Sequence, residues 1–108
     1  MGVPERVQLR RQFAAFKTPD YRGKSGPLRL SFVASPQPAA VAYAIGRHVG
    51  NAVIRNRIRR RLRSLIAELS TPLQPGTYLI KCGIGTDLLS YDDLRTHLNR
   101  ALDGLPAA

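Results

Sequence analysis

The sequence predicts an α+β domain in which helices pack against a small sheet. Three observations indicate this class: a long apolar stripe at helical spacing after residue 50, alternating strand-like segments on both sides of it, and Gly- and Pro-rich breaks between the segments. A chain of 108 residues has the length of one domain, so we expect residues 1–108 to form a single folded unit.

The first half of the chain is expected to contain one short helix and two strands. Residues Gln8–Lys17 have the apolar spacing of a short helix. The stretch Thr18–Pro27 is rich in Gly and Pro and is expected to be a loop. Residues Leu28–Ser35 and Ala40–Gly46 both alternate between two faces, which is typical of strands.

The central segment Asn51–Leu69 is expected to be a long helix with two different faces. Its apolar residues recur at helical spacing and form one stripe: Ile54, Ile58, Leu62, Leu65, Ile66 and Leu69. The opposite side carries Asn56, Arg59, Arg60 and Arg63, with Arg57 and Arg61 towards its flanks. The helix therefore has one stripe to pack on a sheet and one basic face left for a partner.

A further strand and a last helix are expected after the long helix. Residues Thr77–Cys82 alternate as a strand. Ser90 is a good N-cap and Asp93 stands at the reciprocal position of a capping box. Gly104 and Pro106 are expected to end this helix. The expected order is helix, two strands, long helix, strand, helix, which we interpret as a small mixed sheet packed by helices.

The charge balance points to a polyanionic partner. The chain has 17 Lys and Arg against 7 Asp and Glu, which gives a formal net charge of +10. Fourteen of the 17 cations are arginine, whose planar guanidinium suits phosphate groups and base edges better than the lysine ammonium does. Nucleic acid is therefore the favoured class of partner.

The number of cysteines and the hydropathy of the sequence indicate in which cellular compartment the protein is expected. The single cysteine, Cys82, cannot form an internal disulfide, which is the usual condition of a reducing compartment. The sequence has no apolar run of roughly 18 residues, which a membrane span requires. Its N-terminus lacks the apolar core of a signal peptide. We therefore expect a cytoplasmic protein with no membrane partner.

The sequence offers no recognisable catalytic or metal-ligating cluster. His48 and His97 are far apart, and the neighbouring acids Asp92 and Asp93 are better explained as the start of a helix. There is no Cys–His spacing for zinc and no glycine-rich phosphate loop. We expect no catalytic residue, no metal ligand and no bound cofactor in the protein itself.

The arginine-rich helix has three possible interpretations: a solvated face, a membrane-surface helix, or a surface for a polyanion. Solvated faces mix charge signs, whereas Arg55/Arg59 and Arg59/Arg63 are repulsive pairs one turn apart. A membrane-surface helix would carry large aromatic side chains on its apolar face, and this stripe has only Ile and Leu. The polyanion interpretation is therefore favoured.

The residues before the helix extend this surface. Gly46 and Gly50 flank Arg47 and His48 at the start of the helix, where free backbone amides attract phosphate. We name the segment from Arg47 to Arg63 the arginine ridge. Its candidate nucleic-acid-binding residues are Arg47, His48, Asn51, Arg55, Asn56, Arg57, Arg59, Arg60, Arg61 and Arg63.

The stretch GNAVIRNRIRRRLR, residues 50–63, resembles the signature of the bacterial ribonuclease P protein component. The similarity extends to the N-terminal LRRQFAAF, to AYAIGRHVG before the signature, and to the later Tyr-Leu-Ile strand and Ser-Tyr-Asp-Asp-Leu helix start. It therefore covers nearly the whole chain. Where the family has Ser-Lys-Lys, this chain has Gly46, Arg47 and His48, so one positive charge depends on pH.

The resemblance implies both a fold and a function. The fold would include a left-handed β-α-β crossover, against the usual right-handed rule. The protein would be the accessory subunit of an endoribonuclease that removes the 5′ leader from precursor tRNA, acting on no small-molecule substrate. It would bind the catalytic RNA subunit, which holds the Mg²⁺ ions, through the Arg-Asn-Arg helix region. It would also guide the leader along a cleft between the first helix and the sheet.

Three aromatic residues are candidates for that cleft: Phe13, Phe16 and Phe32. Unpaired bases stack on such rings at roughly 1–3 kcal/mol per base. Core packing is the other interpretation, because aromatic side chains at this spacing are usually buried. Two other functions remain open at this stage: a stand-alone RNA-binding protein of ribosomal type, and an autonomous nuclease.

Overall fold

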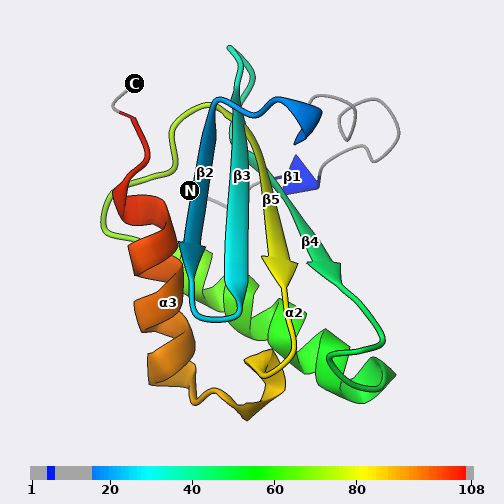
Figure 1. The fold of residues 1–108 in the computed structure, drawn as a ribbon. Coiled ribbons are helices and arrows are strands. Elements are labelled where there is room, and N and C mark those ends of the chain that lie inside the picture. Colours follow the sequence, from blue (N-terminus) through cyan, green and yellow to red (C-terminus); the bar gives the residue numbers. More distant parts are fainter. Residues whose placement is uncertain (1–4, 7–15, 107–108) are drawn as a thin grey trace.

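The computed structural model describes residues 5–6 and 16–106 of the chain. The helix predicted over Gln8–Lys17 falls almost wholly outside these residues, as does Phe13. The described part is a mixed sheet with two long helices, which confirms the α+β class (Figure 1).

The sheet has five strands in the order β1-β4-β5-β3-β2. Their bounds are Glu5–Arg6 for β1, Tyr21–Ser25 for β2, Leu28–Ala34 for β3, Ala40–Ile45 for β4 and Gly76–Cys82 for β5. β2 and β5 both pair with β3 in antiparallel fashion, whereas β4 is parallel to β5 and to β1. The strands predicted for β3, β4 and β5 are confirmed to within one or two residues.

Strand β2 corrects the sequence-based prediction, which made Thr18–Pro27 a loop. The breaker residues belong to a tight hairpin, in which Gly26 takes a positive φ of 55° between β2 and β3. Gly23 is a poor strand former, but a Cβ at this position would overlap the backbone oxygen of Ala101. The close approach of the C-terminal helix therefore requires glycine there, and pairing with β3 overrides local propensity.

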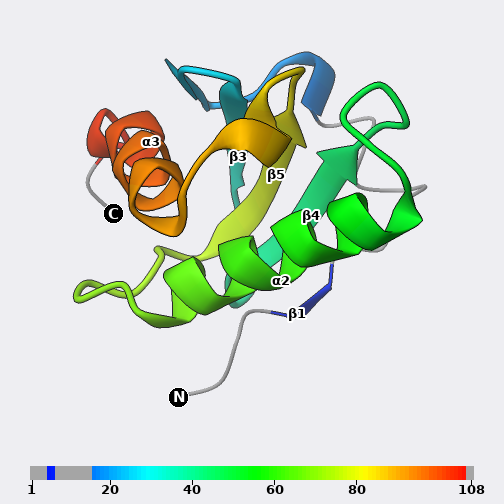
Figure 2. The same ribbon diagram turned by 90° about the horizontal axis from the view of Figure 1, so that it is seen from below.

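Both long helices cover the same face of the sheet, which we call the inner face (Figure 2). Helix α2 spans Ala52–Ala67 and helix α3 spans Tyr91–Asp103. Tyr21 fixes α3 to β2, because its hydroxyl donates a hydrogen bond of 2.7 Å to the backbone oxygen of Ala101. Neither α2 nor α3 covers the other face, which we call the outer face (Figures 1 and 2).

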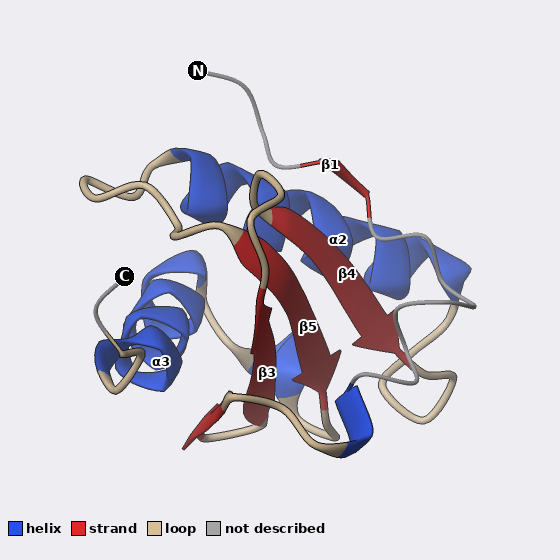
Figure 3. Ribbon diagram, turned by 90° about the horizontal axis from the view of Figure 1, so that it is seen from above, coloured by secondary structure: helices blue, strands red, loops and turns tan. Residues whose placement is uncertain are grey.

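The connection from β4 through α2 to β5 is a left-handed crossover. β4 and β5 are parallel neighbours, and α2 lies behind the sheet when both strands point downwards with β4 on the right (Figure 1). The view from above shows α2 on that same side (Figure 3). This arrangement confirms the handedness that the family resemblance implied, and it is the exception to the usual rule.

The core lies between the inner face and the two helices. The predicted stripe of α2 is confirmed, because Ile58, Leu62, Leu65 and Ile66 are all buried. Ser90 caps α3 as predicted, since its Oγ accepts a hydrogen bond from the Asp93 N–H at 3.0 Å. Leu62 is fully buried, and truncating such a leucine to alanine typically costs about 2–5 kcal/mol. The stripe therefore fixes which side of α2 faces outwards.

Candidate nucleic-acid interface

Helix α2 begins with a side-chain cap. Asn51 has an extended backbone, and its Oδ1 accepts a hydrogen bond of 3.0 Å from the Ile54 N–H. Asparagine is among the best N-cap residues because it satisfies one of the unpaired amides of the first turn. Asn51 was predicted to bind RNA, and the structure gives its side-chain oxygen a structural role in starting the ridge helix.

The outward face of α2 is strongly cationic. Asn56, Arg57 and Arg60 are exposed, whereas Arg55, Arg59, Arg61 and Arg63 are half-buried along the flanks. Within the described part of the chain, none of the six arginines of α2 forms a salt bridge. Arg59 instead donates a hydrogen bond of 2.9 Å to Asn56 Oδ1. A basic face is therefore present and the described acids do not neutralise its charge, but Arg57 is exposed on it whereas Arg59 and Arg63, predicted to point outwards, are half-buried.

The two flanks of the ridge lie against different parts of the fold. On one side, Arg61 Nη1 is 3.4 Å from the backbone oxygen of Leu89, in the loop before α3. On the other side, Arg63 and Arg59 lie near Tyr43 of β4. Burial raises the pKa of Tyr43 to about 12, and the two positive charges offset part of this increase. The helix is thus held on both sides while its outward face stays accessible.

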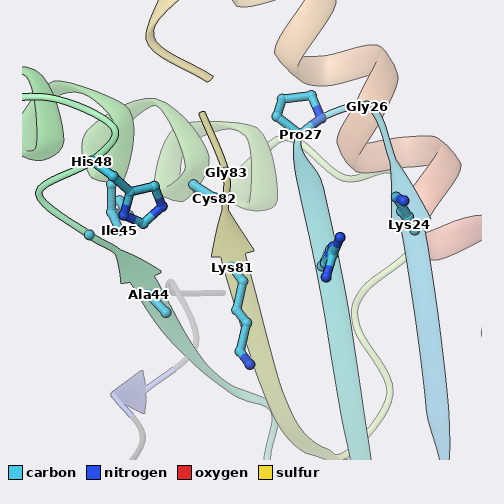
Figure 4. A pocket seen from close by; sticks show the side chains of 11 residues that line it. Lys24, Gly26, Pro27, Ala44, Ile45, His48, Lys81, Cys82 and Gly83 are labelled. Atoms are coloured by element: carbon cyan, nitrogen blue, oxygen red, sulfur yellow. The ribbon is translucent and has the colours of Figure 1, made fainter. Parts of the chain in front are cut away.

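The turn before α2 presents two further residues. Arg47 and His48 are exposed, whereas Val49 is buried and its N–H donates to the Gly46 oxygen at 3.1 Å. A Cβ on Gly50 would lie 2.7 Å from Ile54 Cγ2, so packing against α2 requires glycine there. His48 lines a hollow at the end of the outer face together with Lys24 and Lys81 (Figure 4). The structure therefore groups His48 with a second set of cations.

The structure separates the candidate leader-binding aromatics. Phe32 is 2% exposed on the inner face, where its ring centroid lies 4.7 Å from that of Tyr78. It cannot stack on a base, and its assignment to the leader cleft is wrong; core packing is the correct interpretation. Phe16 is half-buried against Ala42 and Leu79 of the outer face. Of the two phenylalanines that the structure describes, Phe16 and Phe32, only Phe16 is partly accessible from outside the protein.

Cations on the outer face were missed from the sequence. Lys24 on β2 pairs in register with Arg29 on β3, and Arg29 pairs with Lys81 on β5. All three side chains are exposed. Side chains of a strand point alternately to the two faces of the sheet, so this alternation predicts which cations share a face. It could not be applied to Lys24, because the sequence-based prediction made β2 a loop.

The described residues include two histidines and one free cysteine. They contain no group of three His, Cys, Asp or Glu residues that could hold a metal ion. His97 Nδ1 lies 2.8 Å from Ser25 Oγ on the inner side, away from His48. Cys82 is buried, and burial raises the pKa of its thiol to about 12. Among the described helices, none is both long and apolar enough to cross a membrane.

Comparison with known sequences decides the family. The sequence profile of the Ribonuclease P family matches residues 1–105. The chain belongs to the Ribonuclease P family. A ribonuclease P protein component from Synechococcus is 36% identical over 110 residues, which cover 94% of this chain and 82% of that protein. The same component from Streptococcus thermophilus is 36% identical over 62 residues, which span 57% of this chain and 56% of that protein.

Solved structures of Ribonuclease P proteins share the fold. The protein from Thermotoga maritima, solved with 1-(4-fluorophenyl)-2-thiourea, superimposes with a TM-score of 0.82 at 15% identity, covering 94% of this chain and 100% of that one. The protein from Staphylococcus aureus gives a TM-score of 0.81 at 13% identity, covering 91% and 92%. At these identities the likeness concerns the fold alone, and it agrees with the mixed sheet and helices described above.

Proposed function

We propose that this chain is the protein subunit of ribonuclease P and that its arginine ridge binds the RNA subunit. The observation that carries the proposal is the outward face of α2, whose arginines have no acidic partner among the described residues. Family membership supports the choice of this RNA over other polyanions.

The physical basis of RNA binding is relief of charge repulsion. Arg55, Arg59 and Arg63 are spaced one turn apart, and like charges at this spacing each cost a few tenths of a kcal/mol. Phosphate groups would neutralise them and release counterions from the RNA, which is the main source of affinity for nucleic acid. The Asn51 cap and the buried stripe would hold the arginines in place before the RNA arrives.

The proposed substrate is precursor tRNA, whose 5′ leader would lie along the outer face near Phe16. An aromatic ring on a sheet surface offers a stacking platform for an unpaired base. This surface faces away from α2, so the RNA subunit and the leader would contact different sides of the protein.

The proposed division of labour gives the cleavage step to the RNA subunit and its Mg²⁺ ions. The described residues offer positive charge and the half-buried ring of Phe16, but no cluster of potential metal ligands. The protein would therefore bind and position both RNAs. A reducing compartment such as the cytoplasm suits its single buried thiol, Cys82.

A reconstitution experiment tests this proposal. The purified protein is mixed with its cognate catalytic RNA and a leader-bearing tRNA precursor at low magnesium, and cleavage is followed with and without the protein. We expect the protein to increase cleavage or substrate affinity. An RNA-binding protein of another kind would leave both unchanged, and cleavage by the protein alone, free of contaminating nuclease, would instead indicate an autonomous nuclease.

A further inference from the structure

Tyr43 of β4 lies beside one flank of the arginine ridge. Helix α2 runs next to β4 (Figures 2 and 3), and the Tyr43 ring packs against the inner-face core. Arg59 and Arg63, one helical turn apart, are close enough to act electrostatically on its hydroxyl. We call these three side chains, Tyr43, Arg59 and Arg63, the rim cluster. It brings one hydroxyl and two guanidinium groups together from a strand and a helix.

The hydroxyl of Tyr43 has no partner in the described fold. Within residues 5–6 and 16–106, it neither donates nor accepts a hydrogen bond. Burial raises the pKa of Tyr43 to about 12, so the hydroxyl keeps its proton near neutral pH and can act as a donor. A half-buried donor of this kind has lost part of its hydration and has gained no bond in return. An acceptor supplied by a binding partner would therefore be favourable here.

The two arginines of the rim cluster keep donors free for the same acceptor. In the described part of the chain, Arg63 forms neither a salt bridge nor a hydrogen bond. Of the five N–H donors of its guanidinium group, Arg59 uses one at Nη1, which donates to Asn56 Oδ1. Side chains one turn apart have Cβ atoms about 5–6 Å apart, so both guanidinium groups can contact one phosphate. Three side chains can thus donate to a single anion.

The opposite flank of α2 differs, because its polar groups are bonded within the protein. The hydroxyl of Tyr91 lies 3.0 Å from Ser64 Oγ and 3.3 Å from Glu68 Oε2. Arg95 lies 3.7 Å from the same carboxylate. The negative charge of Glu68 disfavours a phosphate group on this side. A tyrosine next to α2 is therefore bonded on this flank, whereas Tyr43 is unbonded on the other.

We infer that the rim cluster binds a backbone phosphate of the RNA subunit, with the Tyr43 hydroxyl donating to a phosphate oxygen held between Arg59 and Arg63. The inference rests on the proposed function and adds to it a residue of the sheet, outside the ridge. It also gives the contact a direction, because the RNA backbone would cross α2 on the β4 flank and not on the flank of Glu68. A neutral hydroxyl contributes a directional hydrogen bond but no charge, so it adds affinity without adding salt dependence.

Two variants that each remove one hydroxyl and keep the ring test the inference. Tyr43→Phe should weaken binding of the protein to the RNA subunit about tenfold, because a hydrogen bond to a charged phosphate is lost. Its thermal midpoint without RNA should equal that of the parent, since this hydroxyl has no partner among the described residues. Tyr91→Phe should do the opposite: it should lower the midpoint by a few degrees and change RNA affinity by less than about twofold.

Salt dependence and a double variant identify the group that the hydroxyl contacts. Tyr43→Phe should leave unchanged the slope of the logarithm of the binding constant against the logarithm of salt concentration. Arg63→Gln should reduce this slope by about one unit, because it removes a charge that neutralises a phosphate. If Tyr43 and Arg63 contact the same phosphate, the double variant should lose less affinity than the product of the two single losses.

Three results would overturn the inference: an RNA affinity of Tyr43→Phe equal to that of the parent, equal losses of affinity in Tyr43→Phe and Tyr91→Phe, or single losses that multiply in the double variant. All three leave the proposed function standing, because the parent protein still binds the RNA subunit. A parent protein that does not bind the RNA subunit would instead refute the proposed function, and the inference with it.

Discussion

Asn51 Oδ1 accepts a hydrogen bond from the backbone N–H of Ile54 at 3.0 Å, and this contact starts the arginine-rich helix. Asn51 of the Gly-Asn-Ala-Val stretch is thus a helix cap. Its position sets where the first turn of α2 begins and so aims Asn56 and Arg57 outwards. Part of the signature therefore serves the geometry of the proposed RNA-binding surface.

The cap makes a stability prediction. Asn51→Ala should lower the free energy of unfolding by about 1 kcal/mol, because it leaves the Ile54 N–H without its acceptor. Asn51→Asp, which keeps an acceptor oxygen, should lose much less. Urea unfolding measures both, with Asn56→Ala as a control on the exposed face. Equal losses in Asn51→Ala and Asn56→Ala would show that the cap contributes nothing.

The two described phenylalanines should behave differently when truncated. Phe32→Ala removes a ring that is 2% exposed and should cost about 3–5 kcal/mol of stability. Phe16→Ala removes a half-buried ring on the outer face, so its stability cost should be smaller and its main effect should be weaker binding of leader-bearing precursor tRNA. Denaturant unfolding and precursor binding, measured for both variants, distinguish the roles. A precursor affinity in Phe16→Ala equal to that of the parent would contradict the leader assignment.

The two faces of α2 should respond oppositely to a change of charge. Ile58→Glu would bury a carboxylate among apolar side chains, a cost that can exhaust the total stability of a domain, about 5–15 kcal/mol. Arg60→Glu, on the outward face, should leave the fold intact. Circular dichroism with thermal melting measures this contrast. A folded Ile58→Glu variant with an unchanged midpoint would refute the orientation of the helix.

The buried thiol should be unreactive in the native protein. Burial raises the pKa of Cys82 from 9.0 to about 12, so the thiolate that reacts with disulfide reagents is scarce at pH 8. Because the folded pKa is the higher one, the contribution of this thiol to stability is complete below about pH 9 and falls as the pH rises towards 12. Rates of modification by a disulfide reagent, with and without urea, test this. Rapid modification without urea would place the thiol at the surface.

The long helix and its faces could be predicted from the sequence because the apolar residues of α2 follow one period over sixteen residues. Strand β2 could not be predicted from the sequence, because Gly23 and the charged residues beside it have low strand propensity. Their conformation is decided by the pairing of β2 with β3. β1 has only two residues and leaves no pattern.

Some residues of the candidate site could be predicted from the sequence, whereas others depend on tertiary structure. The outward arginines of α2 followed from periodicity, whereas the burial of Phe32 depends on which face of β3 the helices cover. The row of Lys24, Arg29 and Lys81 depends on the register of three strands that are distant in sequence. The grouping of His48 with that row also depends on tertiary structure, because the turn after β4 brings it there.

The salt dependence of binding to the RNA subunit tests the role of the arginine ridge most directly. For the parent protein, the logarithm of the binding constant should fall linearly with the logarithm of salt concentration. Arg60→Ala should weaken binding and reduce the slope by about one unit for each phosphate that the arginine neutralises. Arg100→Ala, which removes the same charge from α3, should leave the slope unchanged. Equal slopes in Arg60→Ala and the parent protein would contradict the proposed interface, because they would show that Arg60 does not bind the RNA subunit.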